Sequence, residues 1–187
     1  MAPADSLTGR GGAAATAFAA AIVIVGLVLN GLAFFVPLDY ARLGELLYPG
    51  IFALTFIANA SVVVPIPYVP IIVRVANVAP SAALVVIAAA AGSMLGESVS
   101  FFIGRAGQHV LRESRITRAM ERVVHRPLLA GGLLFLLAAP LNPFFDVAGL
   151  AAGALGLRYR VFAGAVFLGR CARFAVIVSV GLGFLRP

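Results

Sequence analysis

Three long stretches of this sequence contain no charged side chain. They run from Gly11 to Leu38, from Leu46 to Val73 and from Val75 to Gly96. About 20 apolar residues in a helix suffice to cross the hydrocarbon core of a bilayer. A soluble chain carries charge on about a quarter of its residues, whereas this chain is 11% charged and 62% apolar. The sequence therefore predicts an all-α polytopic membrane protein.

The stretch from Gly11 to Leu38 is predicted to be an N-terminal transmembrane helix. A cleaved signal peptide is the alternative, because Arg10 precedes a run that contains small residues. The apolar region of a signal peptide is usually about 7–15 residues long, and this run is far longer. Its length favours a helix that is retained.

Prolines interrupt the stretch from Leu46 to Val73, in the segment VVVPIPYVPII. They are Pro65, Pro67 and Pro70. A proline lacks the N–H that a helix needs and restricts the residue before it, so one continuous helix is excluded. At membrane depth, broken backbone is tolerated only where protein or a water-filled cavity satisfies its polar groups. We therefore expect a re-entrant hairpin, with one limb at Ile51–Val64 and the returning limb at Ile71–Val78.

A second break of the same kind interrupts the apolar chain after Pro127. Its residues include Pro140, Asn142 and Pro143, and Asp146 follows among small residues. A second re-entrant pair of helices is the simplest interpretation. Asp146 is expected to cap the returning limb, since an aspartate accepts hydrogen bonds from the first N–H groups of a helix; facing a cavity is the alternative.

Two stretches are expected to form complete transmembrane helices, Pro80–Ile103 and Val161–Leu185. Each carries charge near its middle, Glu97 in the first and Arg170 and Arg173 in the second. A charge at the bilayer centre costs at least about 2.5–3.5 kcal/mol on insertion scales, so it usually pairs or lines a wet cavity. We favour a role in a transport path over the alternative, a purely structural lock between two helices.

The two halves of the sequence repeat each other at an offset of 73 residues. The superposed pairs are Pro67 with Pro140, Pro70 with Pro143, Gly96 with Gly169, and Phe101 with Phe174. One full helix separates the two breaks, so the second half would start from the opposite side of the membrane. We therefore predict an inverted repeat of a re-entrant helical hairpin plus a transmembrane helix, with an extra N-terminal transmembrane helix. The same offset pairs Glu97 with Arg170 and predicts an ion pair between them.

These assignments divide the chain into two parts. Residues 1–50 hold the N-terminal tail, the first transmembrane helix and a short polar connector, and residues 51–187 form one membrane domain. Within that domain, residues 51–104 are the first repeat, 105–126 a basic loop and 127–187 the second repeat.

The loop at 105–126 carries six arginines against two glutamates, a net charge of 6 − 2 = +4. The positive-inside rule therefore predicts that it faces the cytoplasm. Most of its arginines recur every three or four residues beside an apolar stripe: Arg112, Arg115, Arg118, Arg122 and Arg126. This spacing is typical of an interfacial amphipathic helix resting on anionic headgroups. A solvated linker that only sets topology is the alternative.

Other features argue against several classes of function. All 14 basic residues are arginines that punctuate apolar stretches rather than coat a soluble face, so no nucleic-acid partner is expected. The single cysteine, Cys171, excludes an intrachain disulfide and a cysteine-built metal site. His109 and His125 both lie in the basic loop, without the spacing of a metal pair. We expect no cofactor, no metal and no enzymatic activity.

The segment GSMLGESVSFFIGRAG resembles the signature of the DedA/VTT family, also called SNARE-associated Golgi proteins. Glycines, an acid, an aromatic residue and a Gly-Arg pair recur there at fixed spacing. PLNPFFDVAGLAAGALGL and GRCARF resemble the second half of the same domain, so the resemblance covers Ile51 to Gly183. It implies two facing re-entrant hairpins and a role in moving phospholipids or polyprenyl phosphates between leaflets. Glu97 matches the acid of the signature and Arg105 its arginine.

The chain also departs from this family. Its proton-coupled members carry an acid beside the first proline break, which PIPYVP lacks, and arginines in the second half, where this chain has FLLAAPLNPFFD. A passive, scramblase-like lipid transporter therefore fits better than an ion-driven pump. A proton- or ion-coupled small-solute transporter and a non-transporting assembly or lipid-organising protein are the alternatives.

The expected partners are membrane lipids, with anionic headgroups favoured, and a homo-oligomer stays open. The expected location is the plasma membrane of a prokaryote. The candidate residues of the transport path are Glu97, Arg170, Arg173, Asp146, Asn142 and Arg105.

Overall fold

The computed structural model describes residues 40–60, 67–107, 126–139 and 145–185, with Ala21, Ile24, Val25 and Val28. Most of the predicted N-terminal helix, the basic loop between 108 and 125, residues 61–66 of the first predicted break and residues 140–144 of the second lie outside the described residues. Every regular element in the described ranges is a helix. The elements are η1 (Tyr40–Leu46), α2 (Leu47–Ala60), α3 (Tyr68–Val78), α4 (Ala82–Ala106), α7 (Pro127–Ala138), α8 (Phe145–Ala154) and α9 (Tyr159–Leu185).

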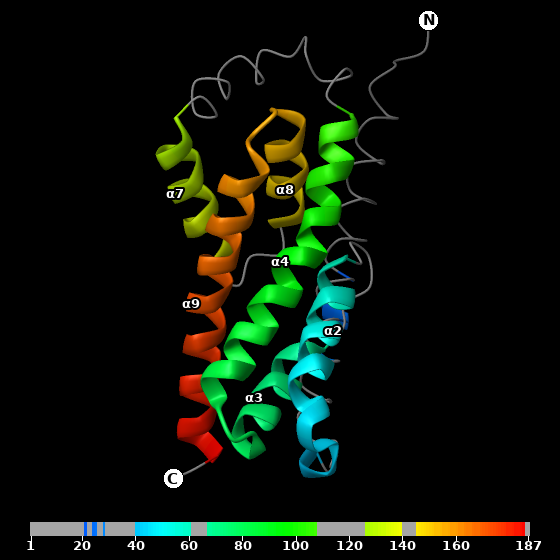
Figure 1. Cartoon of the computed structure of the whole chain (residues 1–187), viewed down its shortest axis with the longest axis vertical. Helices are drawn as coiled ribbons and strands as arrows, with labels where there is room; N and C mark the ends of the chain where they lie inside the picture. The colour runs from blue at the N-terminus through cyan, green and yellow to red at the C-terminus, as the bar shows by residue number, and fades with distance from the viewer. Residues whose placement is uncertain are drawn as a thin grey trace, which may run out of the picture.

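Two long helices, α4 and α9, form the scaffold and run side by side in opposite directions (Figure 1). They contain 25 and 27 residues. At 1.5 Å per residue, either helix exceeds the roughly 30 Å of a hydrocarbon core. Helix α4 begins after Ser81, whose hydroxyl caps it by accepting a hydrogen bond from the N–H of Leu84 at 3.3 Å.

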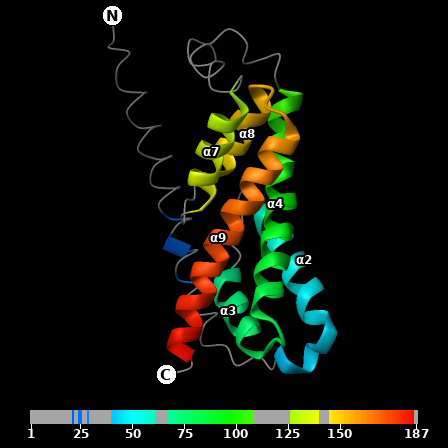
Figure 2. The same cartoon turned by 60° about the vertical axis from the view of Figure 1, so that its left-hand side comes forward.

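Two pairs of short helices pack against this scaffold from its opposite ends. Helices α2 and α3 lie along one half of the long helices, and α7 and α8 lie along the other half (Figure 1 and Figure 2). The first helix of each pair packs on the long helix that follows it, α2 on α4 and α7 on α9. The second helix packs on the other long helix, α3 on α9 and α8 on α4. The two halves of the chain therefore share one packing pattern.

Three described stretches are long and apolar enough to cross a membrane by length and composition: Arg42–Ala60, Ala82–Ala106 and Tyr159–Leu185. The last two correspond to the predicted full-length helices. In the first, Gly44 has φ 50° and kinks the chain inside η1, three residues before α2 begins. A positive φ is easy only for glycine. The regular part, α2, has 14 residues, about 21 Å at the helical rise.

The limits of the first helix pair differ from the prediction. Helix α2 begins four residues before Ile51 and ends at Ala60, and α3 begins at Tyr68 rather than at Ile71. Pro70, predicted to lie in the break, instead occupies the first turn of α3. The N–H groups of a first turn have no partner inside the helix, so a proline is tolerated there. Pro67 occupies the N-cap position of α3.

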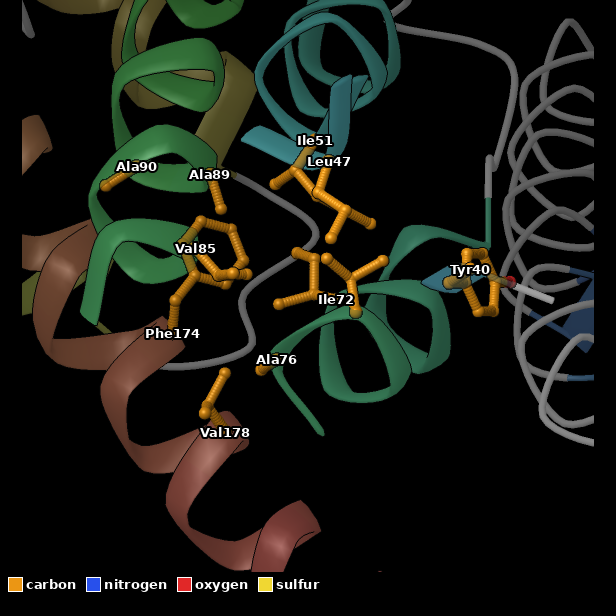
Figure 3. Close-up of a cluster of buried hydrophobic side chains, with 11 residues drawn as sticks. Tyr40, Leu47, Ile51, Ile72, Ala76, Val85, Ala89, Ala90, Phe174 and Val178 are labelled. Atoms are coloured by element: carbon orange, nitrogen blue, oxygen red, sulfur yellow. The ribbon is translucent and has the colours of Figure 1, made fainter. Parts of the chain in front are cut away.

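One hydrophobic cluster holds the α2–α3 pair to the scaffold (Figure 3). Leu47 and Ile51 of α2 face Ile72 of α3, while Val85 of α4 and Phe174 of α9 close the cluster. Four helices thus share one core. Helices within a bilayer associate mainly through van der Waals packing of this kind, because lipid is as apolar as the cluster itself.

A second cluster holds the α7–α8 pair. Phe101 of α4 and Phe162 of α9 lie at its centre with ring centroids 4.6 Å apart. Leu134 of α7 and Ala152 of α8 pack around them. The turn from α8 to α9 contains Gly156 at φ 77°, which lets the chain reverse direction within a few residues.

Glycines allow the short helices to approach the backbone of the long ones. A Cβ added at Gly153 of α8 would overlap the carbonyl oxygen of Phe101 and lie 2.9 Å from the backbone nitrogen of Arg105. A Cβ at Gly92 of α4 would likewise overlap the carbonyl oxygen of Phe52 on α2. Small residues at such positions are typical of helix packing in membranes.

Gly153→Ala is therefore expected to destabilise the protein by about 1–3 kcal/mol, because one methyl group forces α8 away from α4. The measurement is thermal unfolding in detergent followed by circular dichroism. Gly164→Ala is the matched control, since a Cβ at Gly164 of α9 meets no atom within 4 Å. It should be neutral or stabilising by up to about 1 kcal/mol, the helix-propensity gain of alanine over glycine. Equal effects of the two substitutions would contradict the close approach.

Candidate functional site

Glu97 and Arg170 form a buried ion pair where α4 and α9 meet. The Nη2 group of Arg170 donates a hydrogen bond to Oε1 of Glu97. The two residues are 1% and 3% exposed, so other parts of the protein shield both charged groups from the surroundings. The ion pair predicted from the repeat is confirmed.

The C-terminal ends of α2 and α7 lie beside the two charged residues. A Cβ added at Gly96, the residue before Glu97, would lie 2.9 Å from the backbone nitrogen of Ala60, the last residue of α2. A Cβ added at Gly169, the residue before Arg170, would lie 2.7 Å from Cβ of Ala138, the last residue of α7. The two glycines that the 73-residue offset superposes therefore perform the same packing role.

The N-terminal ends of α3 and α8 approach the same place. Tyr68, the first residue of α3, accepts a hydrogen bond at 3.3 Å from Nη2 of Arg173, one turn beyond Arg170. In α8, a Cβ added at Gly149 would lie 3.7 Å from the carbonyl oxygen of Glu97. Four short helices thus end within about one or two turns of the ion pair. Helix N-termini carry partial positive charge and C-termini partial negative charge.

Arg173 lies on α9, half-buried and close to aromatic groups. Besides its bond to Tyr68, its guanidinium carbon lies 5.9 Å from the ring centroid of Phe174. This distance is at the limit of a cation–π contact. The sequence predicts Arg173 but gives no role to Tyr68. A tyrosine in a proline-rich apolar segment is itself a signal, because a buried hydroxyl usually finds a hydrogen-bond partner.

Three serines surround Glu97 on α4, and sequence reasoning assigns none of them a role. Ser98 donates to the carbonyl oxygen of Met94 at 2.8 Å and lies 3.1 Å from the hydroxyl of Tyr159. Ser93 and Ser100 are buried, and their hydroxyl groups have no hydrogen-bond partner in the described part of the chain. The clustering of three serines in GSMLGESVS was the available signal.

Arg105, a predicted member of the transport path, is not brought to the ion pair. It lies in the last turn of α4, eight residues and roughly 12 Å along the axis from Glu97. Its side chain is exposed, and Nη1 donates to the carbonyl oxygen of Leu157 at 3.1 Å. This bond ties the end of α4 to the turn before α9.

The other predicted residues lie at the start of α7 or α8 or outside the described part of the structure. Asp146 is the second residue of α8, and its side chain lies outside the described part of the structure. Arg126 is exposed at the N-cap position of α7. The predicted residues outside the described ranges are Pro65, Pro140, Asn142, Pro143, Arg112, Arg115, Arg118 and Arg122. Within those ranges, no group of three or more histidine, cysteine or acidic residues could hold a metal ion.

Comparison with known families agrees with this architecture. The VTT domain model matches residues 64–183, nearly two thirds of the chain. The chain belongs to the VTT domain family. This is the domain of the DedA and SNARE-associated Golgi proteins, as the motif around Glu97 predicts. The match begins after α2, whereas the resemblance read from the sequence begins at Ile51.

No curated protein and no solved structure matches this VTT protein. Its family and the three stretches of the described residues that are long and apolar enough to cross a membrane make it an integral membrane protein. The ion pair therefore lies on helices long enough to carry it into the bilayer, where a charge is expensive unless it is paired.

Removing one partner of the ion pair should destabilise the protein more than removing both. Arg170→Met leaves the Glu97 carboxylate buried without its guanidinium, at an expected cost of about 3–5 kcal/mol. Adding Glu97→Leu should recover part of this loss, with a coupling of at least about 1 kcal/mol between the two positions. Thermal unfolding of the four proteins in one detergent measures the coupling. Strictly additive losses would mean that the two side chains do not stabilise each other.

Proposed function

We propose that this VTT protein moves lipids between the two leaflets of a membrane by a scramblase-like mechanism. The substrate class is phospholipids or polyprenyl phosphates. One observation carries the proposal: a buried Glu97–Arg170 ion pair is surrounded by the ends of four short helices, part-way along the two long ones. A protein that only needed to span the bilayer would be more stable with apolar residues at these two positions.

The two short helix pairs are best understood as re-entrant hairpins related by an inverted repeat. Each pair lies along one half of the long helices (Figure 1), and its first helix ends beside the ion pair. The matching packing of α2 on α4 and of α7 on α9 supports the repeat, as does the 73-residue offset between Glu97 and Arg170. Transporters with inverted repeats commonly place their substrate site between the repeats, at broken helices.

The chemistry of the cluster suits an anionic headgroup. Arg170 and Arg173 are separated by one turn of α9, and a guanidinium matches the geometry of phosphate oxygens. The N-termini of α3 and α8 add backbone N–H groups, which favour anions. Glu97 competes with the headgroup for Arg170, so a phosphate would be bound weakly enough to leave. The acyl chains would remain in the lipid throughout.

This proposal includes no chemical conversion of the lipid, and it makes membrane lipids the partners of the protein. The basic loop at 105–126 would face the cytoplasm of a prokaryote and attract anionic lipids to the protein. The first transmembrane helix would flank the domain. Transport would be passive. The acid beside the first proline break and the arginines of the second half, which the resemblance to the DedA/VTT family links to proton coupling, are replaced in this chain.

Glu97→Gln and Arg170→Ala should each slow lipid translocation at least about tenfold, which corresponds to about 1.4 kcal/mol of lost transition-state stabilisation. The assay reconstitutes the protein in vesicles with a fluorescent phospholipid and measures the fraction that an external reductant can quench over time. Arg160→Ala is the matched control, because Arg160 is an exposed arginine in the first turn of the same helix. It should translocate at the wild-type rate.

Each variant is compared below its unfolding temperature, so that loss of folding is not scored as loss of activity. The assay is repeated with a pH gradient across the vesicles. Equal rates with and without the gradient support passive translocation, whereas a rate that collapses with the gradient supports a proton-coupled transporter. Wild-type rates in both Glu97→Gln and Arg170→Ala would contradict the proposed site.

A further inference from the structure

Two buried serines flank the ion pair on the same helix. Ser93 and Ser100 are 0% and 1% exposed, and neither hydroxyl makes a hydrogen bond within the described ranges. A serine inside a helix commonly bonds back to the carbonyl group one turn earlier, as Ser98 does with Met94. Buried polar groups without a partner are rare in proteins and call for an explanation.

The spacing places both hydroxyl groups on the face of α4 that carries Glu97. Ser93 precedes Glu97 by four residues and Ser100 follows it by three, and residues three or four apart share a helix face. At the helical rise the two serines lie roughly 6 Å and 4.5 Å from Glu97 along the axis, in opposite directions. Together with the ion pair, they form a polar line of about two turns inside the apolar scaffold.

A cation lies on the same side of the ion pair as Ser93, and a glycine of α8 faces Ser100. Helices α4 and α9 are antiparallel, so Arg173 lies on the same side of the ion pair as Ser93. On the other side, a Cβ added at Gly149 of α8 would lie 3.5 Å from Cβ of Ser100. That distance is an ordinary van der Waals contact, so the glycine leaves about the space of one methyl group beside Ser100.

We propose that Ser93 and Ser100 donate hydrogen bonds to the phosphate oxygens of a lipid headgroup, one on each side of the ion pair. This inference rests on the proposed lipid translocation and names two further binding residues for it. A headgroup entering from one surface would meet Ser93 and Arg173, pass the Glu97–Arg170 pair and then meet Ser100. Ser98 takes no part, because its hydroxyl is already bonded to Met94 and lies beside Tyr159.

Alanine substitutions separate this role from a structural one. Ser93→Ala and Ser100→Ala should each slow translocation about threefold to tenfold, the loss expected for one hydrogen bond to the moving group. Neither should lower the unfolding temperature, because no hydrogen bond within the described chain is removed. Ser98→Ala is the matched control. It should lower the unfolding temperature, since it loses two contacts, and leave the translocation rate unchanged.

A second measurement does not depend on lipid transport. In a Cys171→Ala background, single cysteines replace Ser93, Ser98 or Ser100, and the vesicles are treated with an anionic, membrane-impermeant methanethiosulfonate. The cysteines at 93 and 100 should react at least about tenfold faster than the cysteine at 98. Opening of the lipid path would hydrate positions 93 and 100 and favour the reactive thiolate there, whereas position 98 stays packed against Met94 and Tyr159. Phosphate-bearing lipid in the vesicles should slow both reactions relative to vesicles of an uncharged glycolipid.

The two measurements distinguish failure of this inference from failure of the proposed function. The serine assignment would be overturned if Ser93→Ala and Ser100→Ala translocated lipid at the wild-type rate and all three cysteines were labelled equally slowly. The proposed translocation would then still stand, because the wild type translocates lipid. The opposite result is a protein that translocates no lipid but whose cysteines at 93 and 100 are labelled fast, with phosphate lipids slowing the labelling. This result would support the two serines as anion contacts and refute the translocation.

Discussion

The ion pair between Glu97 and Arg170 is the interaction on which the rest of the structure depends. In hydrocarbon, a charge or a backbone polar group is tolerated only where protein satisfies it. The chain brings together one carboxylate, two guanidinium groups and four helix ends in one place, so that these polar groups lie near one another rather than against lipid. The long helices α4 and α9 are the elements that bring the two halves into contact.

Close backbone packing makes this arrangement stable enough to hold buried charge. Gly96 and Gly169 let the ends of α2 and α7 reach the residues next to the ion pair, and Gly153 lets α8 lie directly on α4. The two hydrophobic clusters then fix each helix pair to the scaffold. Without the glycines the short helices would stand farther away, and lipid chains rather than helix ends would adjoin the charges. Packing and polar chemistry therefore depend on the same few positions.

Much of this could be predicted from the sequence because the signals are strong ones. A long uncharged run identifies most of α4, and an apolar stretch with two arginines near its middle identifies α9. The 73-residue offset predicts the ion pair of Glu97 with Arg170 before any coordinates are known. Helix limits were less predictable, since Pro70 is compatible with the first turn of α3 as well as with a break. Arg105 matches a family motif, but it lies at a helix end away from the ion pair. The prediction missed this because the spacing of a motif does not report how deep each residue lies in the membrane. The bond between Tyr68 and Arg173 joins residues 105 apart, and no local pattern reveals it.

The depth of the short helices in the bilayer tests the central claim most directly. If α2 crossed the whole bilayer, its end would lie at a membrane surface and could not adjoin an ion pair at the bilayer centre. Spin labels at exposed positions on α2 and α7 report depth through their contrasting collision rates with oxygen and with a water-soluble nickel complex. Leu46 immediately precedes α2 and Leu128 lies in the first turn of α7, while Ile57 and Leu137 lie near the ends of these helices. The account predicts shallow labels at Leu46 and Leu128 and labels near the bilayer centre at both Ile57 and Leu137. A label at Ile57 or Leu137 at headgroup depth would contradict it.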